Sequence, residues 1–429
     1  MNDTPIRSLQ GTEDVLPGRW GHWRALQAAA ARLLGLYGYG EIRTPIIEDT
    51  RLFVKGTGET TDIVEKQMYT IDAGEGESIT LRPEGTPSAV RCYLEKNLHK
   101  TEPFQKFWYA GPMFRRERPQ KGRLRQFHQI GVEAIGSASA LLDAETMVLA
   151  CDIFRQAGLT KLRVLVNSIG CPQCRPRYRE ALRGTLDAVR GRLCEDCRRR
   201  VDRNVLRVLD CKEEPCKEVA GGLPGMIDFL CDECRAHRDV LNDQLRRQNV
   251  QYEEDPRLVR GLDYYTRTVY EIKHESLGAR DTICGGGRYD GLVEEFGGPP
   301  TPCVGFAMGV EAALLAMEAE LGEAADTAPR PDVFVICFDA GALARCFELV
   351  RTLRSEGVSA EMDFEARSAK AQMRRANRLG SPYCFLIGER EIASESVLIK
   401  VMADGRQFSV PWTGAAREVG RLLTVEDKR

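Results

Sequence analysis

The clearest alternation of hydrophobic and polar positions lies between residues 104 and 136, where it predicts two β-strands joined by a loop. In the second strand, Gln129, Gly131 and Glu133 share one face, and the alternate positions from His128 to Ala134 share the other. We expect the apolar face to enter the core, which leaves an amide, a gap and a carboxylate as the floor of a pocket for a small polar molecule. A solvated face with a bulge at Gly131 is the alternative interpretation of the hairpin alone.

The loop between the two strands is basic. Between Arg115 and Arg125 it has six Lys or Arg residues and one acid, Glu117. This is more positive charge than a hairpin needs for solubility. It suits a polyphosphate, because Arg binds two phosphate oxygens at once.

Hydrophobic periodicity places further elements along the chain up to residue 321. The segment 41–53 is predicted to contain a short strand stopped by Pro45, which belongs at a sheet edge or an interface. The other predicted elements are helices at 20–37, from about 88 and at 141–159, strands at 161–170 and 266–272, and a Gly-spaced strand that leads into a helix across 303–321.

Residues 323–331 form a linker of small residues and Pro, and a second pattern follows it. From residue 332 onward, apolar runs alternate with amphipathic helices, which predicts a small α/β domain with a mostly parallel sheet. In one of these helices, Lys370, Arg374 and Arg378 recur every four residues and form a basic stripe. A solvated helix face is the ordinary interpretation of such a stripe.

Length and charge limit the classes of function. The 429 residues suggest about three domains, and the net charge of -2 means that any contact with nucleic acid depends on local basic patches. The first residues lack the apolar segment of a signal peptide, and no uncharged apolar run approaches the ~18 residues of a membrane span. We therefore expect a cytoplasmic protein with no membrane contact.

A Cys-rich segment interrupts the chain at residues 171–237. In a reducing compartment, C-x-x-C pairs indicate metal binding more often than disulfides. Two pairs suffice for one structural Zn²⁺ and four pairs for two, although the spacing does not assign the partners. Ordinary burial of small Cys side chains is the alternative. The candidate ligands are Cys171, Cys174, Cys194, Cys197, Cys211, Cys216, Cys231 and Cys234.

Several polar side chains stand where the local sequence holds them in place. Pro and Gly residues flank Glu84 and Thr86 in a turn before a helix, where a carboxylate either binds an ammonium group or is only a helix-entry charge. Arg260 lies at a Gly bend, from which a guanidinium reaches into a cleft. The three Gly residues at 285–287 fit neither the phosphate-loop motif nor the dinucleotide motif, and we expect them to let the backbone approach a flat ligand.

Six motifs occur together in an order known from one family: GETTDIVEKQMYT, LRPEGT, FRRERPQKGRLRQFHQIGVE, VRGLDYYTRTVYE, GGGRYDGL and GFAMGVE. Over essentially its whole length the chain resembles histidyl-tRNA synthetases, a class II aminoacyl-tRNA synthetase family. RGLDYY and GGGRYDG are specific to the histidine enzymes and their paralogues. The resemblance implies a homodimer with an α+β fold, in which an antiparallel-sheet catalytic core (1–170 and 238–322) carries the Cys-rich insertion (171–237) and an α/β anticodon-binding domain (332–429).

The reaction that the resemblance implies is the activation of L-histidine with ATP and Mg²⁺ to histidyl-adenylate, followed by transfer to tRNA(His). Arg115 and Arg260 would be the catalytic residues and grip the α-phosphate from two sides, because fixed positive charge accelerates a reaction between two anions. The histidine-binding residues would be Glu84, Thr86, Gln129, Glu133, Tyr264 and Tyr265. ATP would contact Arg115, Arg123, Arg260, Gly287 and Arg288, and tRNA phosphates would contact Lys370, Arg374 and Arg378.

One position departs from the family pattern. The last motif of the family reads Gly-x-Glu-Arg, whereas this chain has Ala312 in place of the Arg. We expect weaker use of ATP unless another cation substitutes, for which Arg123 and Arg288 are candidates. The departure also favours an alternative function, that of a paralogue that does not aminoacylate: a regulatory subunit of ATP phosphoribosyltransferase, or a pseudo-synthetase that senses tRNA or histidine.

Overall fold

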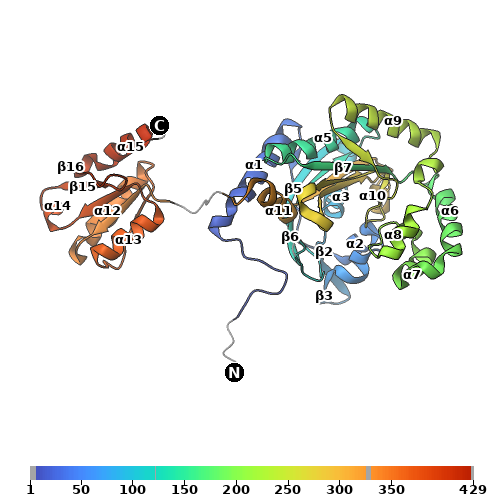
Figure 1. The fold of residues 1–429 in the computed structure, drawn as a ribbon, viewed down its shortest axis with the longest axis horizontal. Helices are drawn as coiled ribbons and strands as arrows, with labels where there is room; N and C mark the ends of the chain where they lie inside the picture. The colour runs from blue at the N-terminus through green and yellow to red at the C-terminus, as the bar shows by residue number, and fades with distance from the viewer. Residues whose placement is uncertain (1–5, 121, 325–329, 427–429) are drawn as a thin grey trace, which may run out of the picture. The chain divides into compact units, whose positions relative to one another are not determined.

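The computed structural model describes residues 6–120, 122–324 and 330–426. The chain divides into two compact units, residues 1–326 and residues 327–429, which are shown in Figure 1. None of the described helices is long and apolar enough to cross a membrane.

The first unit is built on an eight-stranded sheet that includes the hairpin predicted from the sequence. Strands β5 (Gln105–Phe114) and β6 (Gln126–Ile135) pair antiparallel without interruption. The sheet order is β1-β5-β6-β11-β10-β9-β7-β8, and only the edge pairs β1–β5 and β7–β8 are parallel. The other strands are β1 (Gly40–Glu41), β7 (Leu162–Ser168), β8 (Tyr252–Glu254), β9 (Thr266–His274), β10 (Thr282–Arg288) and β11 (Cys303–Gly309).

One face of this sheet forms the main hydrophobic core. Ile130, Val132 and Ala134 project from β6 into that core, so the predicted inward face is confirmed. Helices α1 (Trp20–Leu36), α5 (Ala140–Gln156), α9 (Asp232–Arg247) and α11 (Val310–Leu321) pack there. Burial of these amphipathic helices against the strands supplies most of the stability of the unit.

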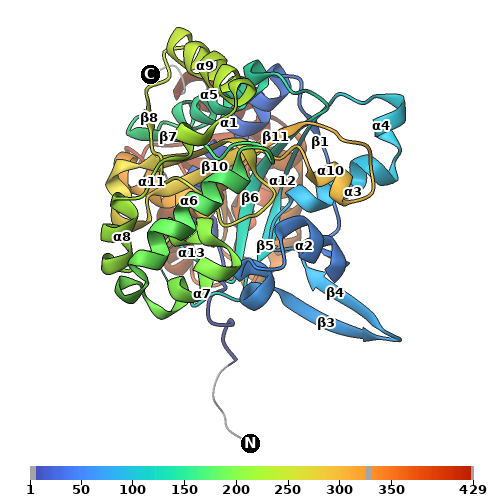
Figure 2. The ribbon, with the colours of Figure 1, turned by 90° about the vertical axis from the view of Figure 1, so that its right-hand side faces the viewer.

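The opposite face holds polar groups beneath shorter helices. Helices α2 (Thr50–Thr57), α3 (Thr86–Glu95), α4 (Leu98–Thr101) and α10 (Leu292–Glu295) lie on this side. The predicted strand that stops at Pro45 is wrong, because β1 ends at Glu41 and β2 (Ile47–Asp49) begins after the Pro. The Asp49 carboxylate accepts the Arg51 backbone N–H at 2.8 Å and starts α2. Strands β2, β4 (Glu77–Leu81) and β3 (Tyr69–Gly74) form a separate antiparallel arm that projects from the unit in Figure 2.

The Cys-rich segment folds as a helical insertion with a hydrophobic core of its own. Helices α6 (Arg175–Ala188), α7 (Glu195–Arg203) and α8 (Glu214–Gly221) lie together at one side of the sheet in Figures 1 and 2. A 3₁₀ turn, η4 (Val205–Val208), follows α7. The chain then returns to the main core through α9.

A buried ion pair joins the sheet to α5. Arg288, at the end of β10, is fully buried and donates to the equally buried Asp143, to Asp290 and to the carbonyl oxygens of Ser137 and Ser139. All five N–H groups of a guanidinium are accounted for by these bonds. The candidate role of Arg288 as an ATP ligand or as a substitute cation does not fit this arrangement, because the side chain has no donor left.

The second unit is the α/β domain predicted from the alternating pattern. Its sheet has the order β13-β12-β14-β15-β16. The first three strands are parallel, whereas the last two are antiparallel, so parallel pairing covers only half of the sheet. The elements are β12 (Val333–Cys337), α12 (Leu343–Ser355), β13 (Ala360–Met362), α13 (Ala369–Leu379), β14 (Tyr383–Ile387), α14 (Glu389–Ala393), β15 (Ser396–Val401), β16 (Gln407–Pro411) and α15 (Ala415–Glu426).

Replacement of Asp143 by Asn tests the buried pair. The substitution leaves the Arg288 charge uncompensated inside the protein, so we expect a loss of about 3–5 kcal/mol in the free energy of unfolding. Urea unfolding followed by circular dichroism measures the loss. Glu253→Gln is the control, since it breaks the exposed pair with Arg163, and losses of equal size in the two variants would contradict the assignment.

Candidate active site

Glu133 is the most enclosed acid on the polar side of the sheet, with 1% of its surface exposed. Its carboxylate accepts hydrogen bonds from Thr86 Oγ1 at 2.7 Å and from the Tyr109 hydroxyl at 3.1 Å, and it also accepts one from the Tyr289 hydroxyl. Burial raises the pKa of Glu133 to about 8, and the three donors offset only part of that effect. The group therefore changes its charge close to neutral pH.

A second buried acid, Glu84, lies in the turn that the sequence predicted. It accepts from Thr57 Oγ1 at 2.8 Å and from the Tyr264 hydroxyl at 2.9 Å. Burial raises the pKa of its carboxyl, and the nearby charges of Arg115 and Arg260 act in the opposite direction. A helix-entry charge would be solvated, so the buried and bonded state of Glu84 favours the ligand interpretation.

Arg115 and Arg260 thus both lie near the Glu84 carboxylate. Arg115 donates from Nε to the Pro83 carbonyl at 2.9 Å and lies over the ring of Phe127. Arg260 forms an ion pair with Glu271 on β9, which raises the pKa of Arg260 despite its burial. The two guanidinium groups come from different parts of the chain and converge on one carboxylate, so together they can grip an anion between them.

Aromatic rings join the two acids into one site. Tyr264 packs against Tyr265 with ring centroids 4.8 Å apart and ring planes tilted by 52°, and its ring contacts that of Tyr289 edge-on at 5.6 Å. Since Tyr264 donates to Glu84 and Tyr289 donates to Glu133, these rings span the space between the two carboxylates. Gln129 is 9% exposed, and its amide oxygen has no hydrogen-bond partner among the described residues. It is therefore an available acceptor.

The gap expected at Gly131 is filled by the protein itself. The ring of Tyr109 lies between Gly131 and Gly85, and a Cβ at either Gly would stand about 2 Å from the ring. The strand pairing runs through Gly131 without a bulge, so the bulge interpretation is wrong. Gly is required here for close approach of the ring, and the floor of the site is an aromatic surface.

The Gly residues of β10 also make room for side chains. A Cβ at Gly285 would lie 2.3 Å from Arg260 Nη2, and one at Gly287 would lie 2.9 Å from the ring of Tyr265. The protein's own atoms approach this backbone, namely the side chains of Arg260 and Tyr265 and the Thr268 carbonyl, where the sequence had suggested a flat ligand. Gly287 consequently lies beneath Tyr265.

Some site residues were missed by the sequence reasoning. Tyr109 alternates on the same face of β5 as Phe107, and period-2 counting marks it only as apolar. Tyr289 stands inside the motif GGGRYDGL and could have been named from it. Thr57 could not be predicted as a site residue from the sequence, because its contact with Glu84 joins positions 27 residues apart and depends on how α2 packs against α3.

The remaining cation candidates have different surroundings. Arg123 lies in the hairpin loop, where its partly exposed side chain pairs with Glu117 at 2.9 Å. Burial lowers the pKa of Arg115, and the charge of Arg123 adds to this effect. Ala312 packs against the main hydrophobic core, while its neighbour Glu311 accepts the backbone N–H of His128. Of the two substitutes considered for the missing Arg, only Arg123 therefore has an accessible charge.

The eight Cys residues of the insertion form two groups of four. All fifteen Cys residues of the chain lie in its described parts and are free thiols. Within each group the sulfur atoms lie within 4.8 Å of one another. The proximal cluster is Cys171, Cys174, Cys231 and Cys234, and the distal cluster is Cys194, Cys197, Cys211 and Cys216.

The spacing of the sulfur atoms fits a tetrahedral metal site. Zn–S bonds of about 2.3 Å place two ligating sulfurs about 3.8 Å apart, whereas a disulfide bond measures about 2.05 Å. In the proximal cluster, Cys171 Sγ lies 3.5 Å from Cys174 Sγ and 3.9 Å from Cys231 Sγ. In the distal cluster, Cys194 Sγ lies 3.8 Å from Cys211 Sγ. The structure thus assigns the partners that the sequence spacing left open.

The basic stripe lies on α13 of the second unit. Lys370, Arg374 and Arg378 are exposed. None of the three forms an ion pair with another residue that the structure describes, so their charges are available to a partner.

Family profiles cover most of the chain. The profile described as histidyl-tRNA synthetase matches residues 11–183 and 200–313. A second profile, described as an anticodon-binding domain, matches residues 332–422. The second match corresponds to the α/β unit that carries α13.

Curated relatives are similar over nearly their whole length. A histidine–tRNA ligase of Halothermothrix orenii is 45% identical over 418 residues, which are 97% of this chain and 100% of the relative. A histidine–tRNA ligase of Pelotomaculum thermopropionicum is 46% identical over 415 residues, or 97% of each chain.

Solved structures agree with these relatives. The apo histidyl-tRNA synthetase of S. aureus has a TM-score of 0.80 at 34% identity and covers 97% of this chain and 100% of its own. A Bacillus halodurans protein described as an ATP phosphoribosyltransferase regulatory subunit/histidyl-tRNA synthetase shares the fold, with a TM-score of 0.62 at 21% identity over 87% of this chain and 97% of its own. On the strength of the full-length relatives and the matched profile, this chain belongs to the histidyl-tRNA synthetase family.

Proposed function

We propose that this protein is a histidine–tRNA ligase that activates L-histidine with ATP in the cytoplasm and transfers the histidyl group to tRNA(His). The observation that carries the proposal is the pair of buried carboxylates, Glu84 and Glu133, joined by Tyr264 and Tyr289 and flanked by two guanidinium groups. Such a site offers negative charge for an ammonium group, polar partners for an imidazole, and positive charge for a phosphate.

Histidine would lie between the two acids. Its ammonium group would be received by Glu84 with Thr86 nearby, and its imidazole would face Glu133 and the free amide oxygen of Gln129. A ring with one donor and one acceptor is selected by a site that pairs with both, since an analogue without them leaves buried polar groups unpaired. Tyr264 and Tyr265 would close the pocket around the ring.

Arg115 and Arg260 would hold the α-phosphate while the histidine carboxylate attacks it. Both guanidiniums are fixed by the protein before ATP arrives, Arg115 by the Pro83 carbonyl and Arg260 by Glu271. Preorganised positive charge lowers the barrier because it needs no rearrangement as negative charge builds up. Arg123 would contact the outer phosphates of ATP in place of the Arg that Ala312 replaces. Gly287 would line the ATP site below Tyr265.

Mg²⁺ would enter with ATP. Among the described residues, the groups of three or more metal-binding side chains consist of Cys alone. A cation that prefers oxygen would therefore be held mainly by the outer phosphates of ATP, as is usual for Mg²⁺ in phosphoryl chemistry. It would supply charge neutralisation beyond that of the two guanidinium groups.

The Cys clusters would each hold one structural Zn²⁺. Four sulfurs at tetrahedral separation leave no open coordination position, which is the arrangement of structural rather than catalytic zinc. Backbone N–H groups point at the sulfurs in both clusters, from Cys231 to Cys174 Sγ and from Cys194 to Cys216 Sγ, each at 3.2 Å. Such donors stabilise thiolates.

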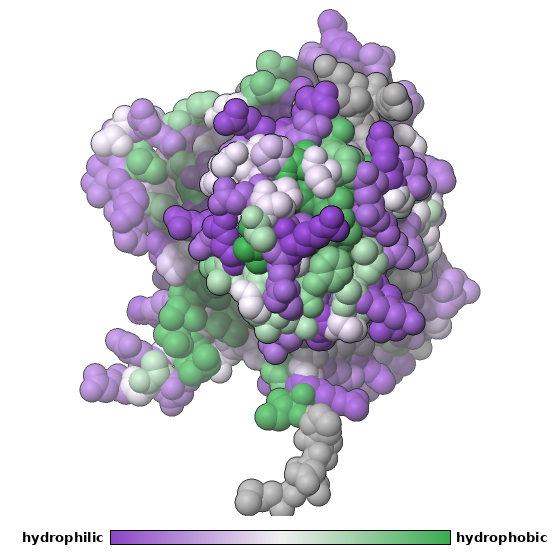
Figure 3. Space-filling view, turned by 90° about the vertical axis from the view of Figure 1, so that its left-hand side faces the viewer, coloured by the Kyte–Doolittle hydropathy of each residue, from purple (hydrophilic) through white to green (hydrophobic). Residues whose placement is uncertain are grey.

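The projecting arm is a candidate dimer contact. It exposes Ile46, Ile47 and Ile71, with 42%, 54% and 49% of their surfaces accessible. Figure 3 shows hydrophobic surface on this arm, at the lower left of the view. Exposed apolar patches mark interaction surfaces, and a homodimer formed here would use the Pro45 segment as the sequence suggested.

Arg260→Gln tests the phosphate role. The variant keeps a polar side chain but removes the charge, and we expect histidine-dependent ATP–pyrophosphate exchange to fall by about 10²–10³-fold. Arg257→Gln is the matched control, because Arg257 belongs to the same loop and 55% of its side chain is exposed. Absence of exchange in the unaltered protein would instead support a paralogue that does not aminoacylate.

The raised pKa of Glu133 predicts a pH-dependent cost of folding. The folded protein keeps a proton on this carboxyl up to about pH 8, whereas the unfolded chain releases it near 4.5. The folded state therefore binds more protons, and stability falls as the pH rises between these values, by about 1.4 kcal/mol for each pKa unit. Compared with Glu133→Gln, the unaltered protein should lose stability in urea from pH 5 to pH 8; a constant difference would show that the carboxyl titrates normally.

Replacing Lys370, Arg374 and Arg378 together by Gln tests the tRNA contact. We expect the KM for tRNA(His) to rise and the salt dependence of binding to flatten by about 0.7–0.9 in log–log slope for each phosphate that is no longer neutralised. Pyrophosphate exchange, which needs no tRNA, should not change. Arg351→Gln on α12 is the control, and an unchanged KM in the triple variant would leave the stripe as solvated surface.

A further inference from the structure

One segment of the insertion, residues 195–208, lies against two loops of the proposed histidine site; we call it the strut. It consists of α7 and η4. From it, Arg207 Nη2 contacts Asp62 Oδ2 at 2.8 Å, and Asn204 Nδ2 donates to Asp263 Oδ1 at 2.9 Å. Asp62 belongs to the loop that follows α2, and Asp263 belongs to the RGLDYY segment.

These two loops lead directly to site residues. The Asp263 backbone N–H donates to the Thr57 carbonyl at 3.2 Å, and the Thr57 hydroxyl donates to Glu84. Gly261 follows Arg260 in the chain, and a Cβ at Gly261 would stand only 2.8 Å from Arg207 Nη1. The strut is therefore in close contact with the backbone that carries Arg260 and with the segment that follows Thr57, a partner of Glu84.

Helix α7 contributes little hydrophobic packing to the strut, whose main apolar contacts with the insertion's core come from Val205 and Val208 of η4. Helix α7 has nine residues, of which only Cys197 and Val201 are buried. Isolated helices shorter than about 12 residues are marginal in water, and four Arg residues in this one add no apolar area. The orientation of α7 therefore depends on contacts beyond its own apolar side chains.

The distal cluster encloses the strut on both sides. Cys194 is the N-cap of α7, and its sulfur accepts the backbone N–H of Cys197 at 3.4 Å. Cys211 follows η4, and Cys216 lies on α8. A metal ion bound to these four sulfurs would join the start of α7 to the residues after η4 and so fix both ends of the strut.

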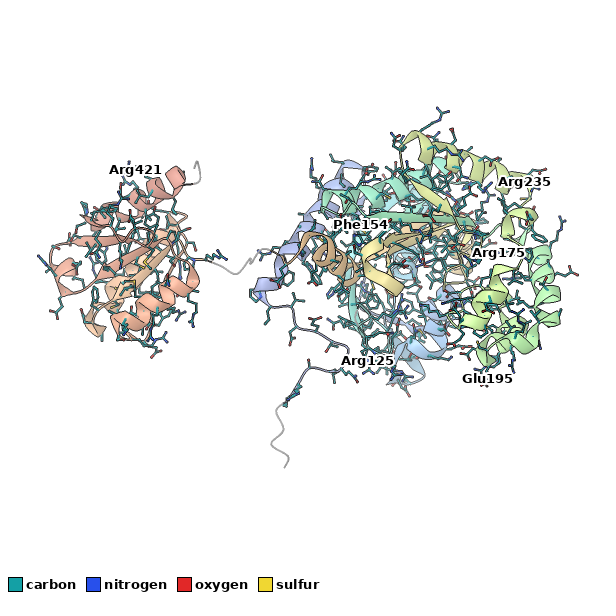
Figure 4. All side chains as sticks on the ribbon, viewed as in Figure 1. Arg125, Phe154, Arg175, Glu195, Arg235 and Arg421 are labelled. Carbon is teal, nitrogen blue, oxygen red and sulfur yellow. The ribbon has the colours of Figure 1, made fainter. Side chains whose placement is uncertain are left out.

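The proximal cluster has a different position. Its two pairs stand at the beginning and the end of the insertion, and Arg175, next to Cys174, donates to the Tyr265 carbonyl. Figure 4 labels Arg175 at the start of α6 and Glu195 at the start of α7, in different parts of the insertion. The two clusters therefore fix different segments.

We propose that Zn²⁺ in the distal cluster is a positioning element of the histidine site: by fixing the strut, it holds residues 56–62 and 260–265 in the arrangement that binds histidine. The inference rests on the proposed function. It assigns the distal metal a role in substrate binding beyond the folding of the insertion, and it makes Asn204 and Arg207 the residues through which the metal acts.

The test compares a variant that cannot hold the distal metal with one that keeps the metal but loses the two shortest contacts between the strut and the loops, those of Asn204 and Arg207; the longer contact of Arg200 with Asp62, at 3.4 Å, remains. Cys211→Ser should reduce bound zinc from two ions to one per chain and raise the KM for histidine in pyrophosphate exchange by about tenfold or more. Asn204→Ala combined with Arg207→Met should raise that KM similarly and retain both ions. Cys92→Ser, outside the clusters, should change neither quantity.

Hydrogen exchange on the full-length protein gives a readout independent of activity. Removing zinc from the distal cluster by Cys211→Ser should increase amide exchange in residues 56–62 and 260–265 of soluble protein. An unchanged histidine KM and unchanged exchange there, with one ion absent, would overturn the proposal. If Cys211→Ser does not fold, the double variant decides, because a normal KM in it excludes the proposed transmission through Asn204 and Arg207. If zinc protects the amides of residues 56–62 and 260–265 from hydrogen exchange but the protein catalyses no ATP–pyrophosphate exchange, the positioning role of the metal would stand and the proposed enzymatic function would be rejected.

Discussion

The structure depends on burying two carboxylates close to each other. Removing an ionised carboxylate from water costs several kcal/mol unless it is paired and hydrogen-bonded. Glu84 and Glu133 are both nearly inaccessible, and Glu133 avoids part of this cost because burial raises its pKa to about 8. Five hydroxyl donations and two guanidinium charges offset this cost. Each donor comes from a different element, so the antiparallel sheet, α2, α3 and the RGLDYY segment must all be in place before either acid is stable. The hydrogen bonds that stabilise the buried acids therefore form only when the whole fold is in place.

Close packing around these acids explains the distribution of Gly. Side chains as large as those of Tyr109 and Arg260 lie directly on the backbone of neighbouring strands, which is feasible only where no Cβ stands in the way. The polar face is consequently built in three layers. A Gly-containing strand lies at the bottom, an aromatic ring or a guanidinium group lies on it, and a carboxylate lies on top. A site built in this way is rigid before its substrates arrive, and rigidity of this kind is what a reaction between two anions gains most from.

Local patterns were enough to predict the hairpin, its inward face, the main helices and the α/β domain, because period and turn chemistry act over a few residues. The structural role of Arg288 was not predictable, since its partner Asp143 is 145 residues away in the sequence. This pairing makes Arg288 part of a buried ion pair, whereas the sequence had suggested a ligand of ATP. Gly131 was misread for a related reason: the sequence shows that a side chain is missing but not that Tyr109 fills the place. The Cys pairs were recognisable, whereas their partition into two clusters needed the path of the insertion.

The proximal cluster also bears on how the insertion is accommodated. Its four sulfurs bring the first and last residues of the helical excursion to a single point beside the end of β7. With the two ends of the insertion held together, the entropic cost of loop closure depends only weakly on the number of residues between them. The length of the insertion therefore has little influence on the strands. The register of the sheet is therefore insensitive to the length of the appended helices, whereas α7 and η4 remain tied to the site through Asp62 and Asp263.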